Sequence, residues 1–454
     1  MSARTDQSSS AAASPFPPAI PRTLLQPGAA TFWLAVVLTG AGAGAGAAAL
    51  TRLLEVVQQV TWSGTGRDIL DAAARASTAR HVLVLLGAGV LTGLGQILLV
   101  RLSSGNGIDI TTALWFTAGR LPALRTLGTA VLSVVVVGMG IPLGREGAPK
   151  QVGAVLANSL ADRNRFSDEQ RRLLVACGAG AGMAAAYGVP LGGALFALEV
   201  LRGRLALRLV LPALLASLVA TVVSWAVLPD APTYLIPAYP TSASVVIWAL
   251  FAGPVAGVVS VGYVRAVAWA DRSRPTGWKK FAWPVVLLGL VGLLSIWFPQ
   301  LLGNGRDISQ LAFTGKVAPL LLLALFFLKP LATIFSLGSG APGGLFTPSL
   351  TVGALLGGLL GHAWSLLWPG VPAGLFAVLG AGAVLAATTQ GPISAVVLLM
   401  ELTGRDRPFV VPLILAVITA TLVSRTIESR SIYEARLTNA EVEERLKARE
   451  PSDH

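Results

Sequence analysis

The amino-acid sequence predicts an all-α membrane protein with many spanning helices, built from two homologous repeats. Three observations lead to this prediction. Only 12% of the 454 residues are charged and 54% are hydrophobic, whereas soluble domains contain about 25% charged residues. Apolar runs of bilayer-spanning length recur along the chain. Three motifs occur twice, in the same order and at nearly constant separation, which indicates an internal duplication.

The apolar runs predict a polytopic protein, because a spanning helix needs about 20 apolar residues. Six runs contain no Asp, Glu, Lys or Arg: Phe32–Leu50, Val82–Val100, Thr126–Leu143, Val210–Pro229, Phe281–Gly305 and Pro408–Ser424. The stretch from Pro330 to Met400 also lacks these residues. It is too long for one spanning helix, so its glycines and prolines must divide it into several helices.

The N-terminal region and the charge pattern are consistent with a membrane protein and indicate no further function. Residues 1–30 are rich in Ser, Ala and Pro and are predicted to be a disordered tail. Residues 31–79 are predicted to form an N-terminal membrane helix and a connection. The formal net charge is +12, but the basic residues lie in short loops between apolar runs. This is the cytoplasmic bias of Lys and Arg in membrane proteins, so nucleic acid is not an expected partner.

The sequence contains no expected metal or cofactor site. The single cysteine, Cys177, excludes an internal disulfide and a cysteine cluster. The three histidines are His81, His362 and His454, and none has a partner at metal-ligand spacing. A membrane-embedded hydrolase would need a Ser/His or metal-ligand set, so an enzyme is not predicted.

The three repeated motifs define the two repeats. The sequence G-N-G-x-D-I occurs at 105–110 and again at 303–308, 198 positions later. Residues 144–148 align with 344–348 at an offset of 200, and 178–199 align with 380–401 at an offset of 202. A Gly/Ala-rich composition does not explain the shared Asn, Asp, Pro and Glu. The prediction is repeat 1 at 80–228, repeat 2 at 229–426, and a cytoplasmic C-terminal helix and tail at 427–454.

Three glycine-rich breaks within the repeats predict a small-anion site. They are Gly105–Ile108, Gly144–Gly147 and Gly344–Phe346. A helix that begins at such a break inside the membrane directs unpaired N–H groups and a positive dipole end inward, and this binds anions. Glu146 is the lone carboxylate at the second break, and an ionisable group at membrane depth is a functional-site hypothesis. The alternative is that these glycines only allow close helix packing.

These residues resemble the CLC family of chloride channels and proton/chloride exchangers over residues 30–437. The family's G-S-G-I-P segment is similar to 105–109, and its G-[KR]-E-G-P segment is similar to 144–148. Its G-x-F-x-P segment is matched in full by 344–348, and its late pore tyrosine is similar to Tyr433. The resemblance implies inverted repeats and a homodimer with one pore per subunit in the plasma (inner) membrane.

The resemblance also implies the site residues. Glu146 would be the gate, since its carboxylate occupies an anion site and leaves when it is protonated. The amides of Leu345 and Phe346, the Tyr433 hydroxyl and the Asn106 side chain would hold the anion. The full expected anion-binding set is Asn106, Gly107, Ile108, Arg145, Glu146, Gly147, Leu345, Phe346 and Tyr433.

Three departures from the family pattern bear on the mode of transport. Asn106 stands where the family usually has Ser, and Asp109 and Ala148 replace two prolines. The internal proton-relay glutamate of the exchangers falls on Val200, a residue found there in several family channels. Glu199 is adjacent, but the next residue of a helix points about 100° away.

The sequence therefore favours a chloride channel gated by voltage or pH, with proton-coupled chloride antiport as the alternative. A cation/proton antiporter is a more distant alternative, because it would need several carboxylates lining a central site. The expected partners are chloride or a similar small anion, protons, membrane lipid and a second copy of the chain.

Overall fold

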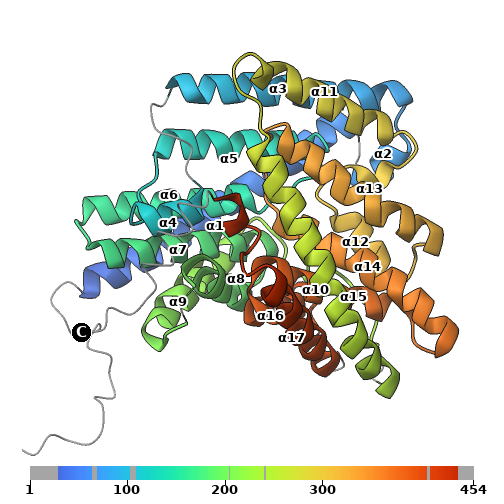
Figure 1. Cartoon of the computed structure of the whole chain (residues 1–454). Helices are drawn as coiled ribbons and strands as arrows, with labels where there is room; N and C mark the ends of the chain where they lie inside the picture. The colour runs from blue at the N-terminus through green and yellow to red at the C-terminus, as the bar shows by residue number, and fades with distance from the viewer. Residues whose placement is uncertain are drawn as a thin grey trace, which may run out of the picture.

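The computed structural model describes residues 29–63, 69–102, 109–203, 205–239, 242–405 and 409–437, and its regular elements are helices (Figure 1). The first half contains α1 (Ala29–Trp62), α2 (Ile69–Ala74), α3 (Thr78–Leu102), α4 (Ile110–Phe116), α5 (Ala123–Gly138), α6 (Gly147–Arg163), α7 (Asp168–Tyr187), α8 (Pro190–Phe196), the π-helix η2 (Ala197–Arg202) and α9 (Leu207–Ser224). The second half contains α10 (Ala243–Arg272), α11 (Lys279–Leu294), the 3₁₀-helix η3 (Pro299–Leu301), α12 (Arg306–Phe313), α13 (Pro319–Gly338), α14 (Phe346–Leu367), α15 (Ala373–Thr389), α16 (Pro392–Thr403), α17 (Val410–Ile427) and the 3₁₀-helix η4 (Glu434–Arg436).

The two halves repeat one packing scheme. Helix α6 packs on α7 as α14 packs on α15, and α1 contacts α5, α6, α7 and α9 as α10 contacts α13, α14, α15 and α17. The equivalent helices α3 and α11 pack against each other, and so do α8 and α16. Contacts between equivalent elements are expected when a two-fold axis relates the repeats. Helix α1 is therefore the structural equivalent of α10.

A reciprocal backbone bridge joins the centres of the two repeats. The Gly144 N–H donates to the Gly344 carbonyl oxygen at 2.8 Å, and the Gly344 N–H donates to the Gly144 carbonyl oxygen at 2.7 Å. These glycines are equivalent in sequence, and the bridge is antiparallel. The repeats are therefore inverted relative to each other, as the resemblance implied.

A second reciprocal contact involves Glu199 and Glu401, which are also equivalent. The Glu199 carboxylate accepts from the N–H groups of Ile393 and Ser394 at 3.1 and 2.6 Å, at the start of α16. The Glu401 carboxylate accepts from the N–H groups of Leu191 and Gly192 at 3.0 and 2.6 Å, at the start of α8. Each carboxylate satisfies the free N–H groups at the N-terminus of the other repeat's helix.

Glycines let the central helices of each repeat approach closely. A Cβ atom on Gly153 of α6 would lie 1.9 Å from the Gly178 carbonyl oxygen of α7. A Cβ atom on the equivalent Gly353 of α14 would lie 2.4 Å from the Gly380 carbonyl oxygen of α15. These glycines, which lie outside the three breaks, therefore serve close packing of the helices.

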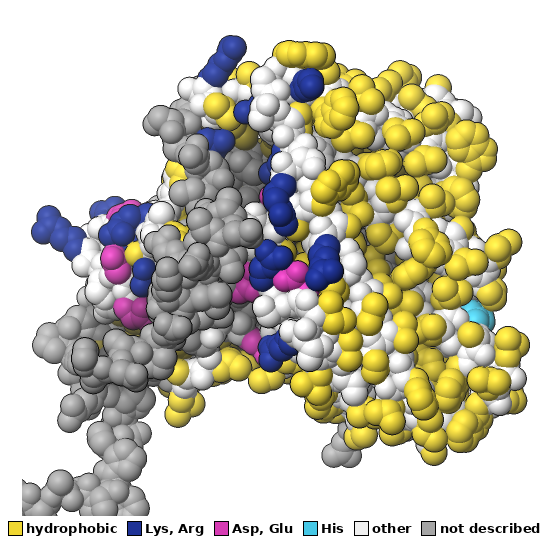
Figure 2. Space-filling model, in the orientation of Figure 1, with side chains coloured by type: hydrophobic (Ala, Val, Ile, Leu, Met, Phe, Trp, Pro, Cys, Tyr) yellow, Lys and Arg dark blue, Asp and Glu magenta, His cyan; other side chains and the backbone are white. Residues whose placement is uncertain are grey.

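The outer surface fits a lipid environment. Among the described residues, six helices are long and apolar enough to cross a membrane: α1, the Thr78–Arg101 part of α3, α10, α13, α14 and α17. Figure 2 shows hydrophobic side chains over most of the right-hand side of this face, whereas charged side chains gather at its centre and left. The charge-free stretch from Pro330 to Met400 is divided among α13, α14, α15 and α16, as predicted. Helix α1 continues to Trp62, past the predicted apolar run that ends at Leu50.

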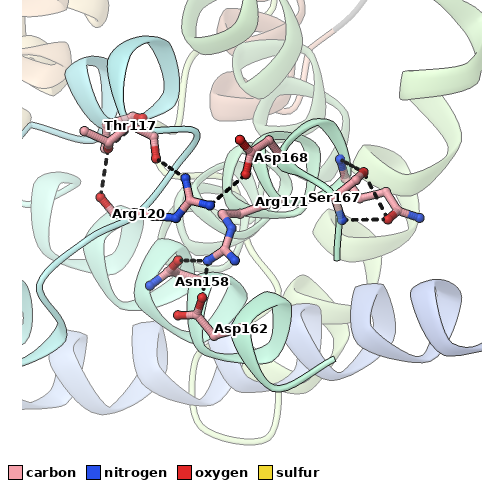
Figure 3. Close-up of polar contacts among 9 residues, drawn as sticks. Thr117, Arg120, Asn158, Asp162, Ser167, Asp168 and Arg171 are labelled. Atoms are coloured by element: carbon pink, nitrogen blue, oxygen red, sulfur yellow. Dashed lines mark hydrogen bonds and ion pairs between the residues drawn. The ribbon is translucent and has the colours of Figure 1, made fainter. Parts of the chain in front are cut away.

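Polar contacts fix the end of α6 that lies away from Glu146 (Figure 3). The buried guanidinium of Arg171 on α7 donates to the Asn158 side chain at 2.9 Å and forms an ion pair with Asp162, both on α6. Ser167 and Gln170 form a capping box at the start of α7. These contacts hold α6 and α7 together, so the N-terminus of α6 has a defined position.

The paired helix caps generate a prediction about stability. Glu199→Gln and Glu401→Gln should each lower the melting temperature by a similar amount, because each removes the charge that stabilises an equivalent helix start. Loss of a helix cap costs about 1 kcal/mol. Tryptophan fluorescence during thermal unfolding in detergent measures the change. Asp230→Asn, which removes a charge from an exposed residue, is the control. A melting temperature that is lowered by only one of the two substitutions would contradict equivalent structural roles.

Candidate functional site

The N-termini of two helices meet at the Gly144–Gly344 bridge. Helix α6 begins at Gly147 with Glu146 as its N-cap residue, and α14 begins at Phe346 with Leu345 as its N-cap residue. Both helices direct unpaired N–H groups and the positive ends of their dipoles toward this junction. The junction therefore favours a negatively charged group, whichever molecule supplies it.

The Glu146 carboxylate occupies this position and is completely buried. One of its oxygens, Oε1, accepts a hydrogen bond from the Phe346 N–H at 2.8 Å. The other, Oε2, lies 3.2 Å from the Tyr187 hydroxyl and 3.2 Å from the Thr347 hydroxyl. Those two hydroxyls are 2.8 Å apart. Three donors from two helices thus converge on a single anionic group.

Two glycines leave the space that the carboxylate fills. A Cβ atom on Gly144 would lie 2.2 Å from both Glu146 carboxylate oxygens, and one on Gly344 would lie 2.0 Å from Oε1. Such contacts are far shorter than any van der Waals distance, so the seated carboxylate requires glycine at both positions. The glycines of the bridge therefore serve the site, unlike those between α6 and α7.

A cavity of about 120 Å³ lies beside Tyr187, and we call it the Arg145 cavity. Its charged lining residues include Glu55, Arg145, Arg306 and Asp307. The Arg145 guanidinium lies 4.9 Å from the centre of the Tyr187 ring and donates to the Ala186 carbonyl oxygen at 3.3 Å. Arg145 thus faces this cavity and Tyr187, and no hydrogen bond between Arg145 and Glu146 is present in the described part of the chain. Its positive charge provides an electrostatic attraction for anions next to the seat of Glu146.

Tyr433 is held in place by the segment that follows α17. The Ile432 N–H donates to the Thr388 carbonyl oxygen at 2.7 Å, at the end of α15. The Ser431 N–H donates to the Glu434 carboxylate at 2.8 Å, and the Glu434 N–H donates back to the Ser431 hydroxyl at 3.2 Å. The Tyr433 hydroxyl is buried and has no hydrogen-bond partner among the described residues. A buried donor without an acceptor is costly, so this hydroxyl is suited to a mobile ligand.

Val200 lines a second cavity of about 410 Å³, which we call the Val200 cavity. Glu199, Gln390, Arg425 and Glu434 also line it. Most of its lining side chains are polar or charged, and the space exceeds the volume that a water molecule needs. Water can therefore reach the level of Val200, although the Glu199 carboxylate is engaged as the cap of α16.

The structure brings together some of the predicted residues. Glu146, Gly147, Leu345 and Phe346 lie at the junction of the two helix N-termini. Arg145 faces the Arg145 cavity instead. Asn106, Gly107 and Ile108 lie outside the described residues. Within the described ranges, no group of three or more His, Cys, Asp or Glu side chains has a geometry for holding a metal ion.

Sequence reasoning missed Tyr187, Thr347 and Lys150. Tyr187 and Thr347 lie 41 and 201 positions from Glu146, so only the folded chain brings their hydroxyls to its carboxylate. Lys150 carried a signal, because it is the only charged residue in the helix between Glu146 and Asp162. A lysine at membrane depth is a functional-site hypothesis in the same way as a carboxylate.

Comparisons with known proteins agree with this geometry. A family model described as "Voltage gated chloride channel" matches residues 88–425. A protein of Salmonella typhi named "Voltage-gated ClC-type chloride channel ClcB" is 32% identical over 416 residues, covering 88% of this chain and 97% of that protein. A protein of the same name from Escherichia coli (strain SMS-3-5 / SECEC) is 32% identical over 379 residues, covering 81% of this chain and 89% of that protein.

Solved structures share the fold. A slow cyanobacterial Cl⁻/H⁺ antiporter has a TM-score of 0.78 at 23% identity, covering 92% of this chain and 99% of that one. A CLC-type fluoride/proton antiporter has a TM-score of 0.73 at 21% identity, covering 90% and 98%. The family model spans most of the chain, and the ClcB proteins exceed 30% identity over most of its length. The chain belongs to the CLC family of voltage-gated chloride channels and related anion transport proteins.

Proposed function

We propose that this chain exchanges chloride for protons across a membrane and that Glu146 couples the two ions, because its carboxylate binds the proton and competes with chloride for the same donors. The observation that carries the proposal is the seat of the Glu146 carboxylate. The Phe346 N–H and the two hydroxyls that hold it are hydrogen-bond donors suited to a halide ion as well. When the carboxylate is ionised it occupies these donors, and when it is protonated it no longer competes with chloride for them.

This competition links the two ions at one site. A proton on Glu146 removes the negative charge from the junction of the helix N-termini, so chloride binds there more strongly. Departure of the chloride lets the ionised carboxylate return to its donors. Each passage of an anion through the site is then accompanied by a change in the proton occupancy of Glu146. The two solved relatives, a Cl⁻/H⁺ antiporter and a fluoride/proton antiporter, support the same mode.

The Val200 cavity supports a route by which protons could reach Glu146. Val200 cannot carry a proton, and this was the argument for a channel. The cavity beside Val200 is large enough and polar enough for water, which can carry protons in place of a side chain. A proton route that includes water does not require a titratable residue at position 200.

A chloride channel is the second candidate, and Val200 is the observation that favours it. The ClcB relatives are also named as voltage-gated chloride channels. In this case protonation of Glu146 would open the anion path, but no proton would cross with each anion. The site and the gate are the same in both candidates, and only the fate of the proton differs.

We further propose that the chain acts as a homodimer with one pore per subunit in the plasma (inner) membrane. The equivalent residues Leu191 of α8 and Ile393 of α16 are 53% and 50% exposed on adjacent helices. Both lie at the helix starts that Glu401 and Glu199 cap, so this apolar face is rigid. A second subunit or lipid would cover it.

The first prediction concerns the gate. Glu146→Gln should preserve chloride flux or raise it and should remove most of its pH dependence, because an amide cannot ionise and holds the anion donors weakly. Chloride efflux from liposomes between pH 4 and pH 7.5 measures this, with Asp230→Asn as a matched control. Complete loss of flux, or a pH dependence as steep as that of the wild type, would count against Glu146 as the gate.

The second prediction tests the seat of the carboxylate through a double-mutant cycle. Gly344→Ala should lower the melting temperature of the wild type, because its methyl group overlaps the Glu146 carboxylate. The same substitution should have a smaller effect in a Glu146→Ala background, in which the overlap is absent. Non-additivity of this kind reports direct contact between two residues. Thermal unfolding of the four proteins measures it, and equal effects in both backgrounds would show that the carboxylate lies elsewhere.

The third prediction separates the two candidates. In reconstituted vesicles a chloride gradient should drive protons uphill, and Glu146→Gln should abolish this movement while chloride flux continues. A pH-sensitive dye and a chloride electrode record both ions in one preparation. A reversal potential that follows the chloride gradient and ignores a pH gradient would support the channel and exclude exchange. Absence of chloride flux from the wild type would contradict both candidates.

A further inference from the structure

Lys150 is a buried lysine that the gate does not use. It lies on α6 four residues after Glu146, so the two side chains share one face of the helix. Lys150 is only 6% exposed. Its ammonium lies 5.0 Å from the centre of the Phe196 ring and 5.3 Å from the centre of the Tyr433 ring. The two rings meet edge to face at 6.1 Å.

The Lys150 ammonium is held by aromatic rings alone. It has no hydrogen bond and no ion pair within the part of the chain that the structure describes. Aromatic faces attract a cation by about 0.5–2 kcal/mol, which is small compared with the cost of burying an unpaired charge. An ammonium has three N–H donors, and none of them has an acceptor here.

Lys329 shows how the same fold treats a structural lysine. It is 1% exposed, and its ammonium donates to four carbonyl oxygens at 2.9–3.2 Å: those of Gln300, Leu301, Leu302 and Gly303. Those carbonyls fully occupy the Lys329 donors and stabilise the end of η3. Lys150 is also buried, at 6% exposure, but none of the described residues accepts a hydrogen bond from it, so its burial needs another explanation.

The neighbouring carboxylates are already engaged. The charges that act most strongly on Lys150 are those of Glu146 and Asp109, which attract it, and of Arg436, which repels it. The Glu146 carboxylate is held by its three donors. The Asp109 carboxylate accepts from the Thr111 N–H at 2.9 Å and pairs with Arg436 at 3.3 Å. Neither supplies an acceptor to Lys150.

The Tyr433 hydroxyl is buried and has no acceptor among the described residues, and its ring contacts Lys150. Two unsatisfied donors on neighbouring side chains, one of them cationic, match a single small anion better than any group of the protein itself. An anion at this position would accept from the Tyr433 hydroxyl and neutralise the Lys150 charge. It would lie one helical turn along α6 from the seat of Glu146.

We propose that Lys150 is an anion ligand of this pore, which binds chloride together with the Tyr433 hydroxyl at a position next to the Glu146 site. This deepens the proposed function, on which it depends. The lysine raises the affinity of the pore for a small, compact anion, because an ammonium is a point charge. It also places a positive charge beside the exit of each anion, and this slows release.

Isothermal titration of the detergent-solubilised protein with chloride, in a buffer whose anion is gluconate, tests the proposal. Lys150→Met should weaken chloride binding at least about tenfold, the loss expected when one charge-assisted hydrogen bond is removed. Lys150→Arg should keep most of the affinity. Lys150→Gln retains a donor without the charge and should give an intermediate value. Lys316→Met, which removes the same charge from an exposed position, should bind chloride like the wild type.

Transport assays on the same proteins separate this proposal from the proposed function. The concentration of chloride that gives half-maximal flux should rise in Lys150→Met, while Glu146 still confers pH dependence. If the wild type transports chloride but Lys150→Met binds it with unchanged affinity, the proposal is overturned and the proposed function stands. If neither Lys150→Met nor Lys150→Gln folds, Lys150 is structural and the proposal is likewise overturned.

Discussion

The meeting of two helix N-termini at the Gly144–Gly344 bridge is the constraint on which the rest of the structure depends. The bridge fixes α6 and α14 with their positive dipole ends facing a common point inside the protein. Such a point is unfavourable unless a negative group occupies it. In the described structure that group is the Glu146 carboxylate, and in the proposed function the anion takes its place during transport. The proposed gating is then the exchange of one negative group for another on fixed donors.

The two inverted repeats share one backbone arrangement, but some of their equivalent side chains differ. Glu199 and Glu401 are equivalent and do the same structural work in both repeats. By contrast, the residue equivalent to Glu146 is Phe346, whose N–H binds the Glu146 carboxylate. At the same offset Lys150 is equivalent to Leu350. The side chains to which we assign a function thus lie where the two repeats differ, on a backbone arrangement that both share.

The sequence was sufficient for the two repeats, for the breaks at Gly144 and Gly344, and for the position of Glu146 at one of these breaks. The breaks and the isolated charge are local features, so a short stretch of sequence is enough to find them. The donors of Tyr187 and Thr347 were not predictable, since their approach to Glu146 depends on how α7 and α14 pack. The direction in which the Arg145 side chain points was also not predictable from the sequence, because adjacent residues at a helix start can face different cavities. The channel interpretation rested on Val200 as a side chain alone, without the cavity beside it.

Val200 illustrates why a residue type is weak evidence about proton movement. An apolar side chain blocks a proton only where it also excludes water, and here it lines a polar cavity of about 410 Å³. The Glu199 carboxylate in the same cavity is held by two N–H groups at the start of α16, and this capping role opposes its use as a mobile proton carrier. In the proposed exchange, the proton and the anion therefore approach Glu146 through different surroundings. Water in the Val200 cavity would serve the proton, while fixed donors of α7 and α14 would serve the anion.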